Sequence, residues 1–364
     1  MNEKATITIK DVARAAGCGV ATASRVLNAS GPASAEMSER VRRAAADLGF
    51  SFSAIGRALQ SRRSMTVGCL VPSLANPVFG EAMQGVQNQL RAAGYQPLIC
   101  ASNYDEATDE DMLRTLLAQK VDGLIATMAA PARSAALRVA RATGVPVSLM
   151  FHDPVEGFAS AYVDNAAAAR EVARQFIARG HRRLGFLALR FASSDRSQSR
   201  YAGFRAECHA HGLAEPALIE MDEREARNPD RIAEILRANP NITGLFASND
   251  FLAIAVQNAA GRIGLRVPDD LSVIGFDGID IGRLLNLPLA TIETDAGAMG
   301  CQAAHSLLIA MQGGGMHQAP PLPFVFRAGA TLAAAPEKKD GGRAAPRPSP
   351  VTLASVPPKT RMNP

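Results

Sequence analysis

The chain has 364 residues, 47% of them hydrophobic, and a formal net charge of +5. Two or three domains with sizeable cores fit this length. The sequence has no apolar run of about 18 residues and opens on polar sequence, so we expect neither a membrane span nor a secretory signal. Its five cysteines are scattered without a CxxC pair. This argues against a disulfide framework and a zinc site and favours the reducing cytoplasm.

The charge is distributed unevenly along the chain. Residues 1–66 carry a net charge of +5, residues 67–336 carry −4, and residues 337–364 carry +4. A basic front end on a slightly acidic body is typical of a nucleic-acid-binding module joined to a regulatory domain. A solvated basic face would give the same excess, so charge alone does not decide between these interpretations.

Three short helices are predicted at the N-terminal end. The first covers residues 8–17 with Thr8 as its cap, and the second covers residues 20–28 after a short turn that contains glycine. The third covers residues 35–48 with Ser34 as its cap. Two helices joined by so short a turn form the geometry that places the second helix in a major groove.

From residue 66 onward, short apolar runs alternate with amphipathic stretches. The runs, each a predicted strand, cover residues 66–72, 96–101, 123–127, 146–151, 184–189, 217–221, 243–247 and 271–276. Helical stretches such as 166–179 and 251–263 lie between them, which favours parallel sheets wound on both faces. So many buried strands suggest two similar lobes that divide near Asp164. The predicted fold class is α/β, with an all-α helix-turn-helix headpiece followed by two doubly wound parallel-sheet lobes.

The first two predicted helices carry a long ordered motif. Residues 9–17 (IKDVARAAG), followed by residues 20–28 (VATASRVLN), closely resemble the headpiece of LacI/GalR-family transcription regulators. The match is far more specific than a generic helix-turn-helix pattern. One departure is Cys18-Gly19, where the family usually has Val-Ser, and glycine remains an acceptable helix cap.

The resemblance implies that Val20, Ala21 and Arg25 read the DNA bases. Arg25 can make a bidentate contact to guanine, and the two apolar residues can touch thymine methyl groups. Packing within the headpiece would also explain Val20 and Ala21, and a solvated position would explain Arg25. The residues suited to phosphate contacts, which set register without reading sequence, are Thr22, Ser24, Asn28 and Ser34, with Thr8 added to the DNA-binding set.

Residues 53–64 resemble the hinge of the same family, which folds into a short helix on DNA. Leu59 then matches the leucine that wedges between the two central bases and bends the duplex. An inert linker is the alternative. Residues 50–53 (FSFS) replace the family's Tyr-x-Pro-Asn, and Gly56 replaces a common alanine. These departures weaken the predicted hinge helix, because glycine costs up to about 1 kcal/mol against alanine.

The resemblance continues into a type I periplasmic-binding-protein-like effector domain. It is carried by residues 67–79, 180–186, 200–204, 248–250, 267–277 and 288–292. The implied domains are a headpiece at 7–52, a hinge at 53–64, an effector-binding domain at 65–333 and a disordered basic tail at 334–364. The effector domain divides into an N-lobe (about 65–163 plus 293–323) and a C-lobe (about 164–292 plus 324–333).

Polar residues follow three of the predicted strands. These are Asn76, Asn249 and Asp277. Ligands of open parallel sheets bind beyond the carboxyl ends of strands, and amide and carboxylate groups supply the donors and acceptors that a polyol needs. We therefore predict that all three contact the effector. Plainer explanations exist, since Asn76 would also cap a helix and Asp277 would also serve a turn.

The family resemblance adds further effector-binding residues. Arg200 matches the arginine that clamps the ligand, although a surface ion pair is its plainer explanation. Phe79 and Phe246 match apolar or stacking positions. Residues 151–153 (FHD) stand where relatives place a polar residue, so Phe151 joins the set while the roles of the next two residues stay open.

A soluble α/β enzyme is the competing class. No GxGxxG follows a strand, and neither GxxxxGK[ST] nor GxSxG occurs. Residues 208–211 (CHAH) lie on a predicted exposed helix without partner ligands, so we expect surface histidines there. The headpiece and the opening sequence disfavour an exported sugar-binding protein. We expect no catalytic residue, no metal and no cofactor.

These features predict a sequence-specific DNA-binding transcriptional regulator, expected to be a repressor. We expect a cytoplasmic homodimer that binds double-stranded operator DNA. A small sugar or sugar-acid effector bound between the lobes would control its operator affinity. No tetramer-forming leucine repeat is visible after Thr331, which favours the dimer. The identity of the effector and the direction of its action stay open.

Overall fold

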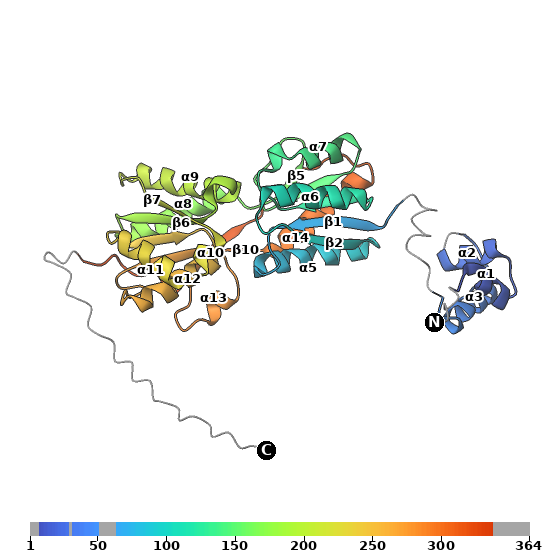
Figure 1. Ribbon diagram of the computed structural model, residues 1–364. Coiled ribbons are helices and arrows are strands. Elements are labelled where there is room, and N and C mark those ends of the chain that lie inside the picture. The colour runs from blue at the N-terminus through green and yellow to red at the C-terminus, as the bar shows by residue number, and fades with distance from the viewer. Residues whose placement is uncertain (1–6, 29–30, 51–62, 338–364) are drawn as a thin grey trace, which may run out of the picture. The chain divides into compact units, whose positions relative to one another are not determined.

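The computed structural model describes residues 7–28, 31–50 and 63–337 (Figure 1). The predicted hinge residue Leu59 and residues 338–364 of the predicted disordered tail lie outside these ranges. The tail prediction is wrong for residues 334–337, which are described, and the N–H of Ala335 donates to the carbonyl of Arg179 (2.8 Å). Within the described ranges, no helix is long and apolar enough to cross a membrane.

The chain divides into two compact units. One comprises the residues up to 163 together with 295–322, and the other comprises 164–294 together with the residues from 323 onward. We call the α/β part of the first unit the N-lobe and the second unit the C-lobe. Each lobe is a mainly parallel sheet with helices on both faces, which confirms the predicted α/β class.

Three helices form the headpiece around a small core of their own. They are α1 (Ile9–Ala15), α2 (Val20–Asn28) and α3 (Ala35–Asp47), close to the predicted bounds. Asp11 accepts hydrogen bonds from the backbone N–H (3.0 Å) and the hydroxyl (2.7 Å) of Thr8, which fixes the start of α1. The buried residues of the headpiece are Val12, Ala13, Ala16, Ala23, Val26, Val41, Ala44 and Ala45.

The N-lobe is built on a five-stranded parallel sheet in the order β2-β1-β3-β4-β5. The strands are β1 (Thr66–Val71), β2 (Gln96–Ala101), β3 (Gly123–Ala126), β4 (Val147–Met150) and β5 (Ala159–Ala161). The helices are α5 (Pro77–Ala92) and α14 (Ala296–Met311) on one face, and α6 (Glu106–Ala118) and α7 (Ala135–Ala142) on the other (Figure 1). With both faces covered, the central strands are continuous apolar runs.

The C-lobe repeats this strand order, β7-β6-β8-β9-β10, and adds β11 antiparallel to β10. The strands are β6 (Leu184–Leu189), β7 (Ala217–Met221), β8 (Gly244–Ala247), β9 (Ser272–Asp277), β10 (Ala290–Thr294) and β11 (Phe324–Arg327). The helices are α8 (Asn165–Ala178) and α9 (Asp195–Ala210) on one face, α11 (Pro229–Ala238) and α12 (Asp250–Arg262) on the other, and the short α10 (Glu223–Ala226) and α13 (Ile281–Leu284).

All eight predicted strands are present, and three further strands complete the sheets. β5 consists of three small residues and therefore has no apolar run to detect. β10 ends half-buried, and β11 lies at an edge with a mixed burial pattern. None of these three strands carries a long run of large apolar residues, which is the signal that apolar periodicity detects.

Each lobe packs one pair of helices at unusually short range. On α5, a Cβ added to Gly85 would overlap the carbonyl oxygen of Gly297 at the start of α14. On α9, a Cβ added to Gly203 would overlap the carbonyl oxygen of Ala166 on α8. Backbone approaches backbone at these two crossings, so only glycine fits there.

The segment after β11 is fastened to the C-lobe by buried hydrogen bonds. The hydroxyl of Thr331 donates to the carbonyl of Val273 (2.7 Å) and accepts from the N–H of Ala290 (2.9 Å). Two residues later, the carbonyl of Ala333 accepts from Nε2 of His181 (3.1 Å). Nδ1 of His181, which lies 3.0 Å from the hydroxyl of Thr243, is then the acceptor on the ring.

His181 should make the stability of the C-lobe sensitive to acid. Burial lowers the pKa of its ring, and the charge of Arg179 lowers it further. The unfolded chain therefore binds a proton where the folded chain does not, and the free energy of unfolding falls as the pH drops below about 6.5. We expect His181→Gln to reduce the loss of thermal stability between about pH 7 and pH 5.

The control for this prediction is His317→Gln, which changes an exposed histidine. Thermal unfolding of the three proteins across this pH range measures the effect. Equal pH slopes for the wild type and His181→Gln would contradict the proposed acid sensitivity.

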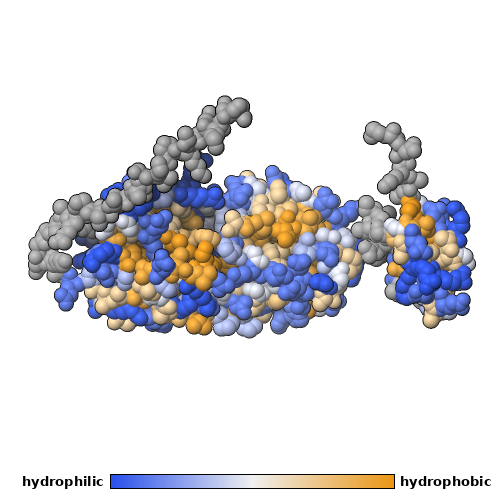
Figure 2. Space-filling model, turned by 90° about the horizontal axis from the view of Figure 1, so that it is seen from below, coloured by the Kyte–Doolittle hydropathy of each residue, from blue (hydrophilic) through white to orange (hydrophobic). Residues whose placement is uncertain are grey.

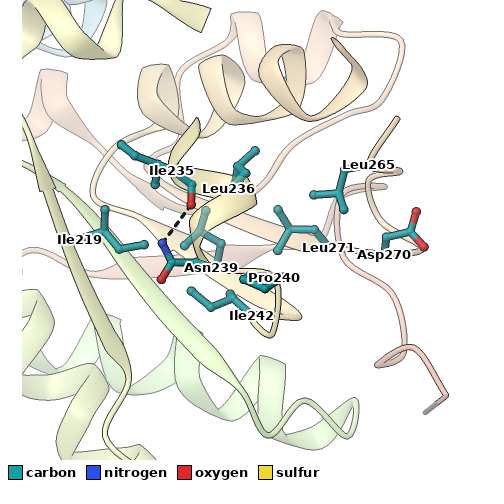
Figure 3. A pocket seen from close by; sticks show the side chains of 10 residues that line it. Ile219, Ile235, Leu236, Asn239, Pro240, Ile242, Leu265, Asp270 and Leu271 are labelled. Atoms are coloured by element: carbon teal, nitrogen blue, oxygen red, sulfur yellow. Dashed lines mark hydrogen bonds between the residues drawn. The ribbon is translucent and has the colours of Figure 1, made fainter. Parts of the chain in front are cut away.

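A small pocket lies in the C-lobe between α11 and the sheet (Figure 3). Asn239 closes one side of it by donating to the carbonyl of Ile235 (2.9 Å). Its volume is roughly 20 Å³, enough for one water molecule and too small for a sugar. None of the predicted effector residues lines it.

Candidate DNA-reading helix and effector site

The α2 helix presents the three predicted base-reading residues on its outer side. Val20 is 43% exposed, and Ala21 and Arg25 are also exposed, whereas Ala23 and Val26 face the headpiece core. An apolar residue of this size left exposed at a helix start is not explained by packing within the headpiece. The interpretation of Val20 and Ala21 as packing residues is therefore disfavoured.

The polar residues around this face are partly engaged within the headpiece. Thr22, Ser24 and Asn28 are half-buried, and the amide of Asn28 donates to the hydroxyl of Ser24 (3.2 Å). The hydroxyl of Ser34 accepts from the N–H of Met37 (3.2 Å) and so caps α3 as predicted. Their proposed phosphate contacts must use the donors and acceptors that these bonds leave over.

The turn that orients α2 against α1 is held by a residue that the sequence pattern did not single out. The guanidinium of Arg40, on α3, donates to the carbonyl of Ala16 at the end of α1. Gly17 follows with φ at +62°, the left-handed conformation that the predicted helix end requires. A contact between α3 and the first turn cannot be inferred from a local motif.

Three aromatic rings meet at the carboxyl end of the N-lobe sheet. Phe79, on the first turn of α5, lies 5.3 Å from Phe151 after β4 and 6.3 Å from Tyr104 after β2, both in edge-to-face geometry. Phe151 has φ at +70°, a left-handed conformation that bulky residues rarely adopt. Asn76 caps α5 by accepting from the N–H of Val78 (3.2 Å), as its plainer explanation predicted.

Beneath these rings the N-lobe holds buried polar groups. His152 is fully buried, and its Nε2 accepts from the N–H of Met128 (3.1 Å) after β3. Asp109 of α6 is also fully buried and accepts from the N–H of Ala129 (2.7 Å). These bonds fix the turn after β3, so His152 supports the site instead of lining it.

In the C-lobe, Arg200 is a buried residue with several contacts at the carboxyl end of the sheet. Its Nε donates to the side chain of Asn165 (2.9 Å), and another nitrogen donates to the carbonyl of Ser248. The guanidinium lies over the ring of Phe276, 3.4 Å from the centroid. With only 7% of the residue exposed, the surface ion pair offered as its plainer explanation is wrong.

Asp277 stands beside this arginine. One carboxylate oxygen lies 4.0 Å from a guanidinium nitrogen of Arg200, and the side chain is 10% exposed. Its φ is +110°, and Gly278 continues the left-handed backbone with φ at +83°. Strain of this kind persists only where the surroundings hold it, and it is enriched at ligand sites.

Asp250 supplies that support. It is fully buried, and one carboxylate oxygen accepts from the N–H groups of Gly278 and Ile279 (both 2.8 Å), while the other accepts from the hydroxyl of Thr291. Burial, reinforced by the charge of Asp277, raises the pKa of Asp250 to about 8. The turn that carries Asp277 is therefore shaped by a carboxyl group that lies beneath it.

Two other predicted effector residues occupy different positions. Asn249 caps α12 by accepting from the N–H of Leu252 (2.8 Å). Phe246 is fully buried inside β8, with its ring 5.0 Å from that of Phe186 and 5.4 Å from that of Phe204. The structure thus places Phe246 in the C-lobe core, where it can influence a ligand only by packing behind residues such as Phe276.

The chain is similar in sequence to known protein families and proteins. Residues 8–52 match the model for bacterial regulatory proteins of the lacI family, and residues 173–328 match a periplasmic binding protein-like domain. The HTH-type transcriptional regulator GntR of Pseudomonas aeruginosa is 33% identical over 311 residues, 84% of this chain and 90% of that protein. This chain belongs to the LacI family of bacterial regulatory proteins.

A further relative and two solved structures are also similar to this chain. GntR of Escherichia coli is 30% identical over 308 residues, 84% of this chain and 92% of that protein. The lac repressor dimer bound to operator and the anti-inducer ONPF has a TM-score of 0.81 at 25% identity, over 90% of this chain and 99% of that one. A LacI family regulator from Enterococcus faecium with bound ribose has a TM-score of 0.66 at 25% identity, over 74% and 99%. The relatives are regulators and not enzymes, which confirms the predicted class.

Residues 208–211 of this LacI-family chain divide between the core and the surface. The prediction that Cys208 lies on an exposed helix is wrong, because Cys208 is fully buried and burial raises the pKa of its thiol to about 12. Its neighbours His209 and His211 do lie at the surface, beside Glu215 and Glu207. In the part of the chain that the structure describes, no group of three His, Cys, Asp or Glu residues is placed to hold a metal ion.

Proposed function

We propose that this chain is a homodimeric repressor of the cytoplasm, which binds operator DNA through α2 and is controlled by a small sugar or sugar acid. The observation that carries the DNA-binding half is the exposed set Val20, Ala21 and Arg25 on a helix whose other side is buried in its own core. The aliphatic stem of Arg25 packs beside Gly31, where a Cβ would crowd it. A guanidinium presented in this way suits bidentate contact with guanine.

The effector half of the proposal is supported by what each lobe presents at the carboxyl end of its sheet. The C-lobe offers Arg200 and Asp277, which together provide donors and acceptors for neighbouring hydroxyl groups. The N-lobe holds the rings of Phe79 and Phe151 there, which are 5% and 7% exposed, and rings of this kind suit the apolar face of a sugar ring. Ribose is bound in the solved relative from Enterococcus faecium, which favours a ligand of this class.

Exposed apolar side chains support the homodimer. Leu284 of α13 is 82% exposed and Ile281 is 49% exposed, and Phe251 at the start of α12 is 39% exposed. In the N-lobe, Leu98 and Ile99 are exposed on β2, an edge strand of the sheet. Figure 2 shows apolar side chains gathered at the surface of both lobes on the face in view. A second copy of the chain would cover such surfaces, and the lac repressor, which has a similar fold, was solved as a dimer.

Arg25→Ala tests the DNA-binding half. We expect it to weaken binding to the DNA upstream of the gene that encodes this chain by about 1 to 3 kcal/mol. Affinity should still decline as the salt concentration rises, because phosphate contacts remain. The control is Arg43→Ala, which removes an exposed arginine of α3. Titration at several salt concentrations measures both effects. Wild-type binding without salt dependence, or equal losses in the two variants, would contradict the proposed contact.

Asp277→Asn tests the effector half. A panel that includes ribose, cellobiose and sugar acids is first screened by thermal shift with the wild type. We expect the stabilising ligand to lose most of its shift in Asp277→Asn and to keep it in Asp280→Asn, which changes a carboxylate that is 87% exposed. A shift that survives in Asp277→Asn would show that the site lies elsewhere. Incubation of the ligand with protein should leave it unchanged, and turnover would favour an enzyme.

A further inference from the structure

The point where the hinge segment enters the N-lobe is fixed by one carboxylate. Asp122, immediately before β3, accepts from the N–H of Ser64 through one oxygen and from the N–H of Met65 through the other, both at 2.9 Å. Asp122 and Ser64 are both half-buried. Paired acceptance by a charged group is stronger than neutral hydrogen bonding and sets the direction of the bound segment.

The backbones of Met65 and Asp122 are also hydrogen-bonded to neighbouring strands. The carbonyl of Met65 accepts from the N–H of Gln96 at the start of β2 (3.0 Å), and the N–H of Asp122 donates to the carbonyl of Thr66 at the start of β1 (2.9 Å). Met65 has φ at +54°, a left-handed conformation that turns the chain sharply just before it enters β1. The entering segment is thereby tied to the amino ends of three adjacent strands.

Pairing of the strands does not account for this arrangement. β1 pairs with β2 from Thr66 and Gln96 onward, and with β3 from Val67 and Gly123 onward. The two bonds to the Asp122 carboxylate lie outside this register, on the residues that precede β1. They extend the order of the sheet by two residues toward the hinge and fix the direction in which the chain enters β1.

We propose that Asp122 is the positioning residue that couples the N-lobe to the headpiece. This inference rests on the proposed function, because it needs two headpieces that bind one operator. By clamping residues 64 and 65, the carboxylate sets where each hinge leaves its lobe and hence the spacing of the two headpieces. Two tethered binding modules gain affinity only when their tethers let both engage together.

The test compares a complete operator with a single half-site, using the full-length chain. DNA that the wild type selects from a random-sequence pool supplies the complete site, and its half supplies the second probe. We expect Asp122→Ala to lose about fivefold or more of its affinity for the complete site and to stay within about twofold of the wild type on the half-site. A structural defect in the headpiece would lower both affinities.

Three further variants make the outcome decisive. Asp295→Ala removes a carboxylate that caps α14 in the same lobe, accepting from the N–H of Ala298 (2.7 Å), and should leave both affinities unchanged. Arg25→Ala should lower both affinities. Should Asp122→Ala fail to fold, Asp122→Asn serves in its place, since its amide nitrogen cannot accept the second N–H.

If Asp122→Ala binds the complete site as tightly as Asp295→Ala does, the coupling role is overturned. A parallel loss on complete site and half-site overturns it as well. Amide hydrogen exchange gives a readout without DNA, since at least one of the N–H groups of Ser64 and Met65 should exchange faster in Asp122→Asn than in Asp295→Ala. Failure of the wild type to select any DNA would refute the proposed function itself, which is a result distinct from any behaviour of the Asp122 variants.

Discussion

Replacement of Asp250 by alanine should lower the free energy of unfolding of the C-lobe by about 3 to 5 kcal/mol. The substitution leaves the N–H groups of Gly278 and Ile279 without their buried acceptor, and the hydroxyl of Thr291 keeps only the carbonyl of Ile292. Urea denaturation measures the loss. Asp280→Ala, at an exposed carboxylate, should change stability by less than about 0.5 kcal/mol. A loss of similar size in both variants would show that the buried bonds of Asp250 contribute little.

Asp250→Asn should separate the role of the hydrogen bonds from that of the proton. The amide oxygen can still accept from the two backbone N–H groups, and the amide nitrogen can donate to the hydroxyl of Thr291, which lies 3.2 Å from the carbonyl of Ile292. We therefore expect this variant to fold with a stability much closer to that of the wild type than Asp250→Ala.

The pH dependence of the wild type follows from the raised pKa of Asp250. The folded chain keeps the proton up to about pH 8, whereas the unfolded chain loses it near its ordinary pKa of about 4. Between these limits the folded state binds more protons, so this group's contribution to stability falls as the pH rises. The stability of the wild type relative to Asp250→Asn should decline from about pH 5 to pH 8 in urea titrations. A constant difference over that range would contradict the assignment.

A second large effect is expected at the crossing of α5 and α14. Gly85→Ala should destabilise the N-lobe by about 3 kcal/mol, because the new methyl group would overlap the Gly297 carbonyl and force the helices apart. Gly80→Ala, on the same helix, places its methyl group in open space and should stabilise the chain by up to about 1 kcal/mol through helix propensity.

Thermal and urea unfolding of the two glycine variants measure effects of opposite sign. Because both substitutions add the same group to one helix, propensity cannot explain a difference between them. Equal effects for Gly80→Ala and Gly85→Ala would show that the two helices adjust without cost at their crossing.

The sequence predicted most of the fold because its signals are local. Alternating apolar runs and amphipathic stretches placed eight strands, among them β2 and β7 at sheet edges, and Thr8 and Ser34 marked helix starts that the structure confirms. β5, β10 and β11 escaped prediction, since none of them carries a long run of large apolar residues. Local patterns detect a strand only when such a run marks it.

The candidate site was predictable only in part. The exposed face of α2, which is proposed to read bases, follows from helical spacing, which puts Val20 and Ala21 outside and Ala23 inside. Position after a strand likewise led to Asp277. Phe246 shows the limit of this reasoning, because family resemblance suggested a ligand contact while the folded chain buries the ring among three other phenylalanines.

The sequence by itself determined the class of this protein: a helix-turn-helix headpiece on a two-lobed α/β body of the LacI family. Only the tertiary structure decided which groups hold the functional residues in place. Asp250 supports the turn of Asp277 from 27 positions earlier in the chain, and Asp122 clamps residues 64 and 65 across more than fifty. Such roles depend on burial and on partners distant in sequence, which no local periodicity encodes.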